Sequence, residues 1–379
     1  MKKILLGTAA LLGTAVMAQG AAAQVTVKFG GDIRFDAAWV DDDQPNSKDI
    51  NFQQEVRFPI TAEGKTDNGL TYGAFVRLRN TGSNHGASST AGTTNGENIY
   101  AERKYIYVGG GFGRLEMGDE YGAVTKLTGF APAVGIGQLD GNYENFTNSG
   151  LFQYVPSNYF NRATKITYYS PNLAGFQVGA GYTPEYDQTG DNNSLLRRVP
   201  GTSYNDVVEL AASYKGEFGG ATVNLGGGYT FGDEDTAIQE EMRLWNVSAA
   251  VGFGGFTVGG TYFDNKGPLV NDPSPNSYPT LLGAPLTGEQ TGWNAGVSYK
   301  NGPIGVAAAY GRTESEFTGT GGDLEDTVWS VGAVYTVAPG LNVMVDGYFV
   351  DSESANTAGA VIPAGNDATI VMLRTQLLF

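Results

Sequence analysis

The 379-residue chain lacks cysteine and has a single histidine, His85. Without cysteine, neither a disulfide framework nor a thiolate metal site can form. His85 stands among small residues in a segment that has no Gly-x-Ser-x-Gly turn to expose a nucleophile. A lone loop histidine beside serines is more often solvated surface than a general base. A hydrolase is therefore the remote alternative among the functions that the sequence allows.

Basic residues are scarce, with 23 lysines and arginines against 39 aspartates and glutamates, and the formal net charge is −16. A nucleic-acid partner would require a basic surface, so this charge argues against one. The acids gather in polar segments between apolar ones, for example at residues 41–43 and 233–235. Such segments are typical of solvated loops.

Long hydrophobic runs are missing after the first 23 residues, where no apolar stretch reaches the roughly 18 residues of a membrane-spanning helix. Residues 1–23 have the layout of a secretory signal peptide: Lys2 and Lys3, an apolar run over 4–17, and alanines at 21–23. Removing them takes away two lysines and no acid, which moves the formal net charge to −18. We expect the remainder, residues 24–379, to form one domain.

The chain is rich in residues that favour strands, with 56 glycines, 21 tyrosines and 19 phenylalanines. Its mean hydropathy of −0.20 resembles that of a soluble protein. A barrel with a watery lumen has the same average, because only alternate residues of each strand face lipid. The pattern along the chain must therefore decide the class.

Apolar residues recur at every second position in sixteen segments bounded by turn residues, which predicts sixteen strands. In the first segment the wet face carries Lys28, Asp32, Arg34 and Asp36, and the other face is apolar. The predicted strands cover residues 25–40, 50–63, 70–80, 102–109, 113–118, 162–170, 176–186, 206–217, 222–231, 243–253, 256–264, 292–300, 304–313, 327–337, 341–350 and 368–379.

Short turns alternate with long, polar loops between these segments. This alternation is typical of an antiparallel meander with one rim in the periplasm and the other outside the cell. The last segment stays apolar on one face up to Phe379, as expected of a strand that closes a barrel in lipid. The sequence thus predicts an all-β, transmembrane, antiparallel β-barrel of 16 strands with short periplasmic turns and long outer loops.

Three stretches resemble the general diffusion porins of Gram-negative bacteria: residues 106–118, residues 166–176 and the terminal Phe379. The resemblance implies a homotrimer in the bacterial outer membrane, in contact with lipid and lipopolysaccharide, and a terminal Phe379 that acts as a signal for the outer-membrane assembly machinery. It also implies that the third outer loop, residues 119–161, folds into the lumen and narrows a water-filled channel for passive diffusion of small polar solutes and ions.

In that family, acids of the inward loop face a basic wall across the constriction. The resemblance places the acidic side at Asp119, Glu120, Asp140 and Glu144. It places the basic side at Arg34, Arg57, Arg77, Arg79, Lys104 and Arg162, with Lys28 and Lys165 as weaker candidates. Arg103 and Lys104 are adjacent, so only one of the two can point inward.

The acidic loops predict weak cation selectivity, because low-dielectric walls focus their field and enrich cations at the mouth. Calcium could bind through oxygen ligands at Asp41, Asp42 and Asp43 or at Asp233, Glu234 and Asp235, although neither run has the spacing of a dedicated calcium loop. No other cofactor is expected.

Two further alternatives use the same barrel. A channel specific for a sugar or another nutrient would line its path with aromatic residues, and the inward loop has eight candidates, which could equally pack the loop to the wall. They are Tyr121, Phe130, Tyr143, Phe146, Phe152, Tyr154, Tyr159 and Phe160. A purely structural anchor would need an extra domain, and every connection is shorter than about 45 residues.

Overall fold

The computed structural model describes residues 25–43, 48–80, 99–140, 142–147, 162–186, 204–233, 241–268, 287–317, 323–355 and 366–379. The predicted signal peptide, His85, Glu234, Asp235 and the second part of the inward loop lie outside these ranges. Within them, none of the helices is long and apolar enough to span a membrane.

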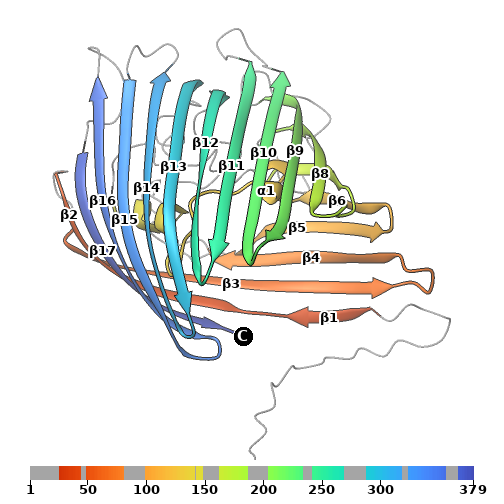
Figure 1. Ribbon diagram of the computed structural model, residues 1–379, viewed down its shortest axis with the longest axis horizontal. Coiled ribbons are helices and arrows are strands. Elements are labelled where there is room, and N and C mark those ends of the chain that lie inside the picture. Colours follow the sequence, from red (N-terminus) through yellow and green to blue (C-terminus); the bar gives the residue numbers. More distant parts are fainter. Residues whose placement is uncertain are drawn as a thin grey trace, which may run out of the picture.

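Antiparallel strands make up almost all of the described chain (Figure 1). In chain order they are β1 (Thr26–Phe29), β2 (Asp32–Asp42), β3 (Ile50–Lys65), β4 (Thr71–Asn80), β5 (Ile99–Gly110), β6 (Gly113–Asp119), β7 (Thr164–Tyr169), β8 (Phe176–Glu185), β9 (Asn205–Phe218), β10 (Ala221–Asp233), β11 (Met242–Phe253), β12 (Phe256–Pro268), β13 (Thr287–Asn301), β14 (Ile304–Phe317), β15 (Asp323–Ala338), β16 (Leu341–Ala355) and β17 (Asn366–Leu378).

Each strand from β2 to β17 pairs with its neighbours in the sequence, and β17 pairs with β2 to close the sheet. The short β1 continues the line of β2, because both pair with β3 on either side of Gly30 and Gly31. Counting β1 and β2 as one, the sheet is a closed barrel of sixteen antiparallel strands. This confirms the predicted fold class and strand number.

The C-terminal Phe379 lies at the break between β1 and β2. Its backbone exchanges hydrogen bonds of 2.8 and 3.1 Å with Gly31. A side chain at residue 31 would overlap the phenylalanine ring, since a Cβ there would lie 2.1 Å from Cζ of Phe379. Glycine at this position therefore lets the last residue dock on the first strand.

Successive residues of each strand face opposite sides of the barrel. On β17, Val371 and Leu373 are about half exposed on the outer face, whereas Ile370 and Met372 are fully buried on the inner face. The outer face of the wall also carries an aromatic band, in which neighbouring rings lie 4.5–5.4 Å apart. The band includes Trp245, Tyr262, Trp293, Tyr310 and Trp329. Such a band is typical of a barrel at a membrane–water interface.

Several strands run further toward the long loops than the alternation predicts. Strand β13 begins at Thr287 rather than residue 292, and β16 ends at Ala355 rather than residue 350. The outward residues of these extensions are polar or charged, as with Glu289 and Glu353. Backbone pairing continues there without an apolar face, so hydrophobic periodicity cannot reveal it.

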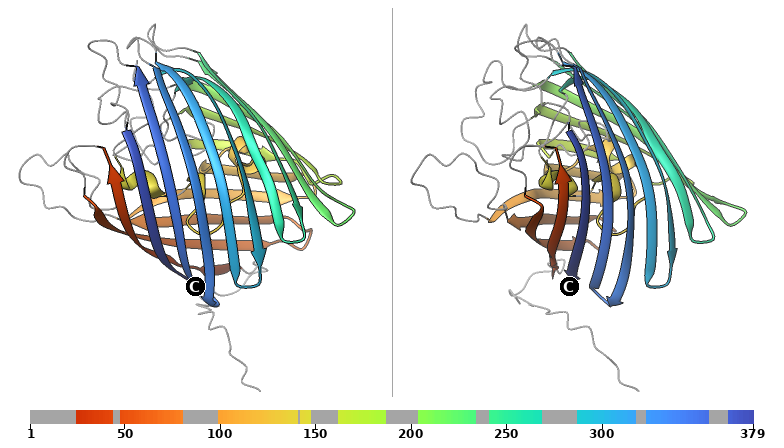
Figure 2. Two further views of the ribbon diagram at one scale, coloured as in Figure 1. Left: turned by 60° about the vertical axis from the view of Figure 1, so that its left-hand side comes forward. Right: turned by 90° about the vertical axis from the view of Figure 1, so that its left-hand side faces the viewer.

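The described part of the loop after β6 contains a short helix, α1 (Ala123–Leu127), and two 3-10 turns, η1 (Gln138–Asp140) and η2 (Asn142–Phe146). All three lie inside the ring of strands (Figures 1 and 2). Helix α1 packs on β8, β9 and β10, η1 on β14 and β15, and η2 on β17. The described loop thus follows the inner wall around the barrel.

Candidate functional site

Five arginines gather on the inner wall, on β2, β3, β4 and just before β7, around two buried glutamates, Glu55 and Glu102. These glutamates are 3% and 5% exposed. We call the seven residues the arginine cluster. Its arginines are Arg34, Arg57, Arg77, Arg79 and Arg162.

Each glutamate of the cluster contacts three arginines. Glu55 pairs with Arg34 at 3.7 Å, with Arg79 at 3.2 Å, and with Arg57. Glu102 pairs with Arg77 at 2.5 Å, with Arg79 at 2.8 Å and with Arg162 at 3.4 Å. Arg79 therefore bridges the two carboxylates, and the five arginines form one connected network.

A β-bulge positions Glu102. In the ladder between β4 and β5, Arg77 faces Arg103 and the next residue, Leu78, faces Ala101, so Glu102 has no partner. A bulge turns the extra residue's side chain to a new direction. Both Glu102 and Arg103 consequently reach the inner side, although they are adjacent in the sequence.

Lys104 lies on the opposite side of the wall from the position expected for it. It shares its face of β5 with Ile106, which is 55% exposed, and it pairs there with Asp119. Thr164 donates a hydrogen bond to the same carboxylate. Because Arg103 points inward, Arg103 rather than Lys104 faces the lumen. Lys104 therefore does not belong to the basic wall, and Asp119 does not belong to the acidic side of the constriction.

Glu120 is in the inward loop as predicted, but it does not face the arginine cluster across open space. It pairs with Arg103 at 2.5 Å and with Lys126 of α1 at 3.2 Å. Lys126 also pairs with Glu116 of β6, which pairs with Arg114 at 2.7 Å. Positive and negative charges therefore alternate along this part of the wall, where three basic side chains are paired with two carboxylates.

The other predicted charges are dispersed. Glu144 is exposed on η2, and the side chain of Asp140 lies outside the described set. Lys165 is 4% exposed and lies 3.7 Å from Glu209. Lys28 is exposed on the same face of the first strand as Arg34.

The inward loop lies on the wall through polar contacts and glycine positions. The backbone N–H of Gly129 donates to Ser248 Oγ at 3.0 Å, and that of Ala131 donates to Asn294 Oδ1 at 2.7 Å. Gln138 Nε2 donates to Asp346 Oδ2 at 2.9 Å. Each contact joins the loop to a different strand, so the loop is held at successive points.

Small residues make room for this loop. A Cβ on Gly226 would lie 2.7 Å from the carbonyl oxygen of Leu127, and a Cβ on Gly228 would lie 2.8 Å from Val124. A Cβ on the outward Gly227 between them would make only ordinary van der Waals contacts, at 3.7 Å or more. Glycines at the inward positions therefore allow the backbone of the loop to approach β10.

Two aromatic side chains of the loop, Tyr143 and Phe146, are buried against the wall, whereas Tyr121 and Phe130 are partly buried. Tyr143 is fully buried and stacks on Tyr348 at 4.3 Å between ring centroids, and Phe146 is buried in the same apolar cluster. Tyr121 accepts hydrogen bonds from Arg77 at 3.4 Å and Arg162 at 3.3 Å. Tyr143 and Phe146 are therefore not available to line an aromatic path for a sugar.

The structure describes all three aspartates of the first candidate calcium site, Asp41, Asp42 and Asp43, but only part of the second. Asp41 and Asp43 share the outer face, whereas Asp42 is on the inner face and accepts a hydrogen bond from Thr147. The three carboxylates cannot converge, and within the described ranges no group of three acidic or histidine side chains could hold a metal. Of the second run only Asp233 is described.

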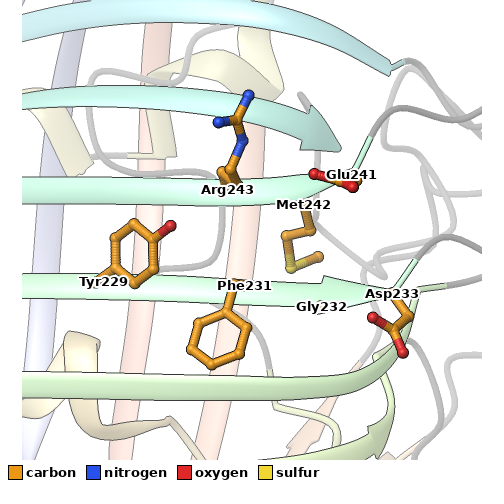
Figure 3. A pocket seen from close by; sticks show the side chains of 7 residues that line it. All are labelled: Tyr229, Phe231, Gly232, Asp233, Glu241, Met242 and Arg243. Carbon is orange, nitrogen blue, oxygen red and sulfur yellow. The ribbon is translucent and has the colours of Figure 1, made fainter.

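A hollow near Asp233 is open to the outside of the barrel (Figure 3). Its lining comes from the outer ends of two neighbouring strands, β10 and β11, and includes Tyr229, Phe231 and Arg243. Tyr229 and Phe231 are about 40% exposed on the outer face. The hollow therefore belongs to the outer surface of the wall rather than to the lumen.

Sequence comparison supports the resemblance. A sequence model of the family described as Gram-negative porin matches residues 7–355. A protein named porin from Rhodobacter capsulatus is 28% identical over 241 residues, which cover 63% of this chain and 68% of that protein.

Solved structures share the fold. A porin refined at 1.8 Å resolution aligns with a TM-score of 0.57 and 21% identity over 93% of this chain and 100% of that one. OmpT of Vibrio cholerae, described as the trimer form of an outer membrane protein, aligns with a TM-score of 0.60 and 16% identity over 94% of this chain and 99% of that one.

Proposed function

The chain belongs to the Gram-negative porin family, whose members form channels in the bacterial outer membrane, and we propose that it passes small hydrophilic solutes and ions by passive diffusion. The observation that supports this function is the two-sided wall. Its outer face is mainly apolar with an aromatic band, and its charged groups include the paired Lys104 and Asp119 and acids at the loop ends of the strands. Its inner face carries charged side chains such as Arg79, Glu102 and Arg103. Charges at mid-depth would be costly on a lipid-facing surface, by about 2–4 kcal/mol for each arginine or lysine.

We propose that the channel is non-specific and has no enzymatic activity. Tyr143 and Phe146 of the inward loop are packed against the wall, which weakens the support for a sugar path. Phe152, Tyr154, Tyr159 and Phe160 lie outside the described ranges, as does His85. The second part of residues 119–161 is proposed to complete the constriction.

Weak cation selectivity is the second part of the proposal. The chain carries a formal net charge of −16. Acids crowd the loop ends of strands β14–β16, where Glu314 faces Glu325 and Glu325 faces Glu353. These side chains are on the outer face, so we expect them to act on ions at the mouth through a field that is screened over about 8 Å at physiological ionic strength.

Planar bilayers test this function. Purified protein should insert as an open, ohmic channel. In a potassium chloride gradient, the reversal potential should lie closer to the equilibrium potential of potassium than to that of chloride. Absence of channels would contradict the diffusion function. A reversal potential of the opposite sign would contradict only the cation preference.

We also propose the assembly and the partners that the family implies. The chain forms a homotrimer in contact with outer-membrane lipid and lipopolysaccharide, and Phe379 serves as a signal to the outer-membrane assembly machinery. Support for the last role comes from the docking of Phe379 on Gly31, which joins the two ends of the barrel. Residues 1–23 are proposed to be removed as a signal peptide.

A further inference from the structure

The arginine cluster carries more positive than negative charge. Five guanidinium groups surround Glu55 and Glu102, and Asp32, which pairs with Arg34 at 2.5 Å, is the third carboxylate in contact with them. Among the residues that the structure describes, five positive charges against three negative charges leave a surplus of two. The net charge of this wall is therefore small compared with the number of charged groups, and the loss of one carboxylate would change it substantially.

The two kinds of group differ in their access to the lumen. The side chains of Glu55 and Glu102 are 3% and 1% exposed, whereas those of Arg57, Arg77 and Arg79 are 21%, 14% and 25% exposed. A solute can contact the guanidinium groups but not the carboxylates. Each carboxylate pairs with three arginines and offsets part of their positive charge from a buried position that a solute cannot reach.

We propose that Glu55 and Glu102 are selectivity-determining residues, because they occupy the donors of the arginine cluster and prevent it from binding anionic solutes. This inference rests on the proposed channel function. The bulge in β5 supports it for Glu102, because an unbulged strand would send that carboxylate away from Arg77 and Arg79.

Replacement of Glu102 by glutamine tests the inference with little change in size. Glu102→Gln raises the surplus from two to three, weakens the hydrogen bonds that Arg77 and Arg79 donate to residue 102, and removes the ion pair with Arg162. Adjacent arginine donors match the geometry of a carboxylate. We expect the ratio of potassium to chloride permeability to fall by about two- to fivefold, from the Coulomb energy of one charge across a few ångströms of water.

Glu217→Gln is the matched control. Glu217 is exposed on β9, on the same face as the buried Ser213 and far along the wall from the arginine cluster, and the variant makes the same change in net charge. Citrate added to the bath is the second probe, because a local carboxylate site would block the current. We expect citrate to block Glu102→Gln and to leave wild type and Glu217→Gln unaffected.

Glu55→Gln provides an independent second variant with the same expectation, should Glu102→Gln fail to assemble. The inference is overturned if the variants that conduct match Glu217→Gln in both permeability ratio and citrate block. Failure of the wild-type protein to conduct would instead overturn the channel function itself, so the two failures are distinguishable.

Discussion

Asp36 and Arg374 form a bidentate ion pair across the seam between β2 and β17, at 2.6 and 2.8 Å. Both residues are almost fully buried, at 1% and 2% exposure. Removing one partner of such a pair leaves the other charge buried without compensation, at a cost of about 3–5 kcal/mol.

We therefore predict that Asp36→Ala lowers the free energy of unfolding by about this amount, measured by urea unfolding in detergent. Arg312→Ala is the control, because Arg312 pairs with Glu314 and Glu325 on the exposed outer surface. Exposed pairs contribute little, so its midpoint should remain close to that of wild type. Equal effects of the two variants would contradict this role for the seam pair.

Much of the inner wall could be predicted residue by residue from strict alternation. Arg34, Arg57, Arg77 and Arg79 are where the two-residue period places them. Glu102 and Arg103 could not be placed in this way, because a bulge interrupts the period between them. The run of three charged residues at 102–104 is the one sequence signal of that irregularity.

At the scale of elements, the strands follow the pattern of the sequence and the inward loop does not. The loop has no period of its own, and its path is decided by room on the wall. Gly226 and Gly228 on β10 supply that room, but a glycine in a strand has several structural meanings and does not by itself predict a packed loop.

We predict that Gly226→Val displaces the inward loop and reduces single-channel conductance, because the new side chain would overlap the backbone at Leu127 and Thr128. Gly227→Val is the adjacent control. Residue 227 faces outward, and a Cβ there would meet its neighbours only at ordinary van der Waals distances of 3.7 Å or more, so conductance should be unchanged. Equal conductance of Gly226→Val and wild type would show that the loop position tolerates the added volume.

At the scale of the whole molecule, the closed sheet explains why the two-residue alternation of the sequence predicts the fold correctly. Each strand must satisfy its hydrogen bonds with neighbours, and only closure removes the last free edges within lipid. The alternating pattern, the short turns and the final apolar strand all depend on that one requirement. The distribution of charge over the assembled wall depends on side-chain pairing, which a linear pattern does not show.

We predict that the purified protein in mild detergent is a trimer, as proposed above from its membership of the Gram-negative porin family. Light scattering corrected for detergent should give three times the mass of one chain. In bilayers, high voltage should close the channel in three equal steps. A monomeric mass together with single-step closure would contradict the trimer.

Closure also has a consequence in time. Asp36 and Arg374 lie 338 residues apart, so the free side of β2 has no partner until the ribosome has made nearly the whole protein. An unsatisfied strand margin readily joins other chains. Until β17 has been made and pairs with it, this margin of β2 therefore stays open to association with other chains.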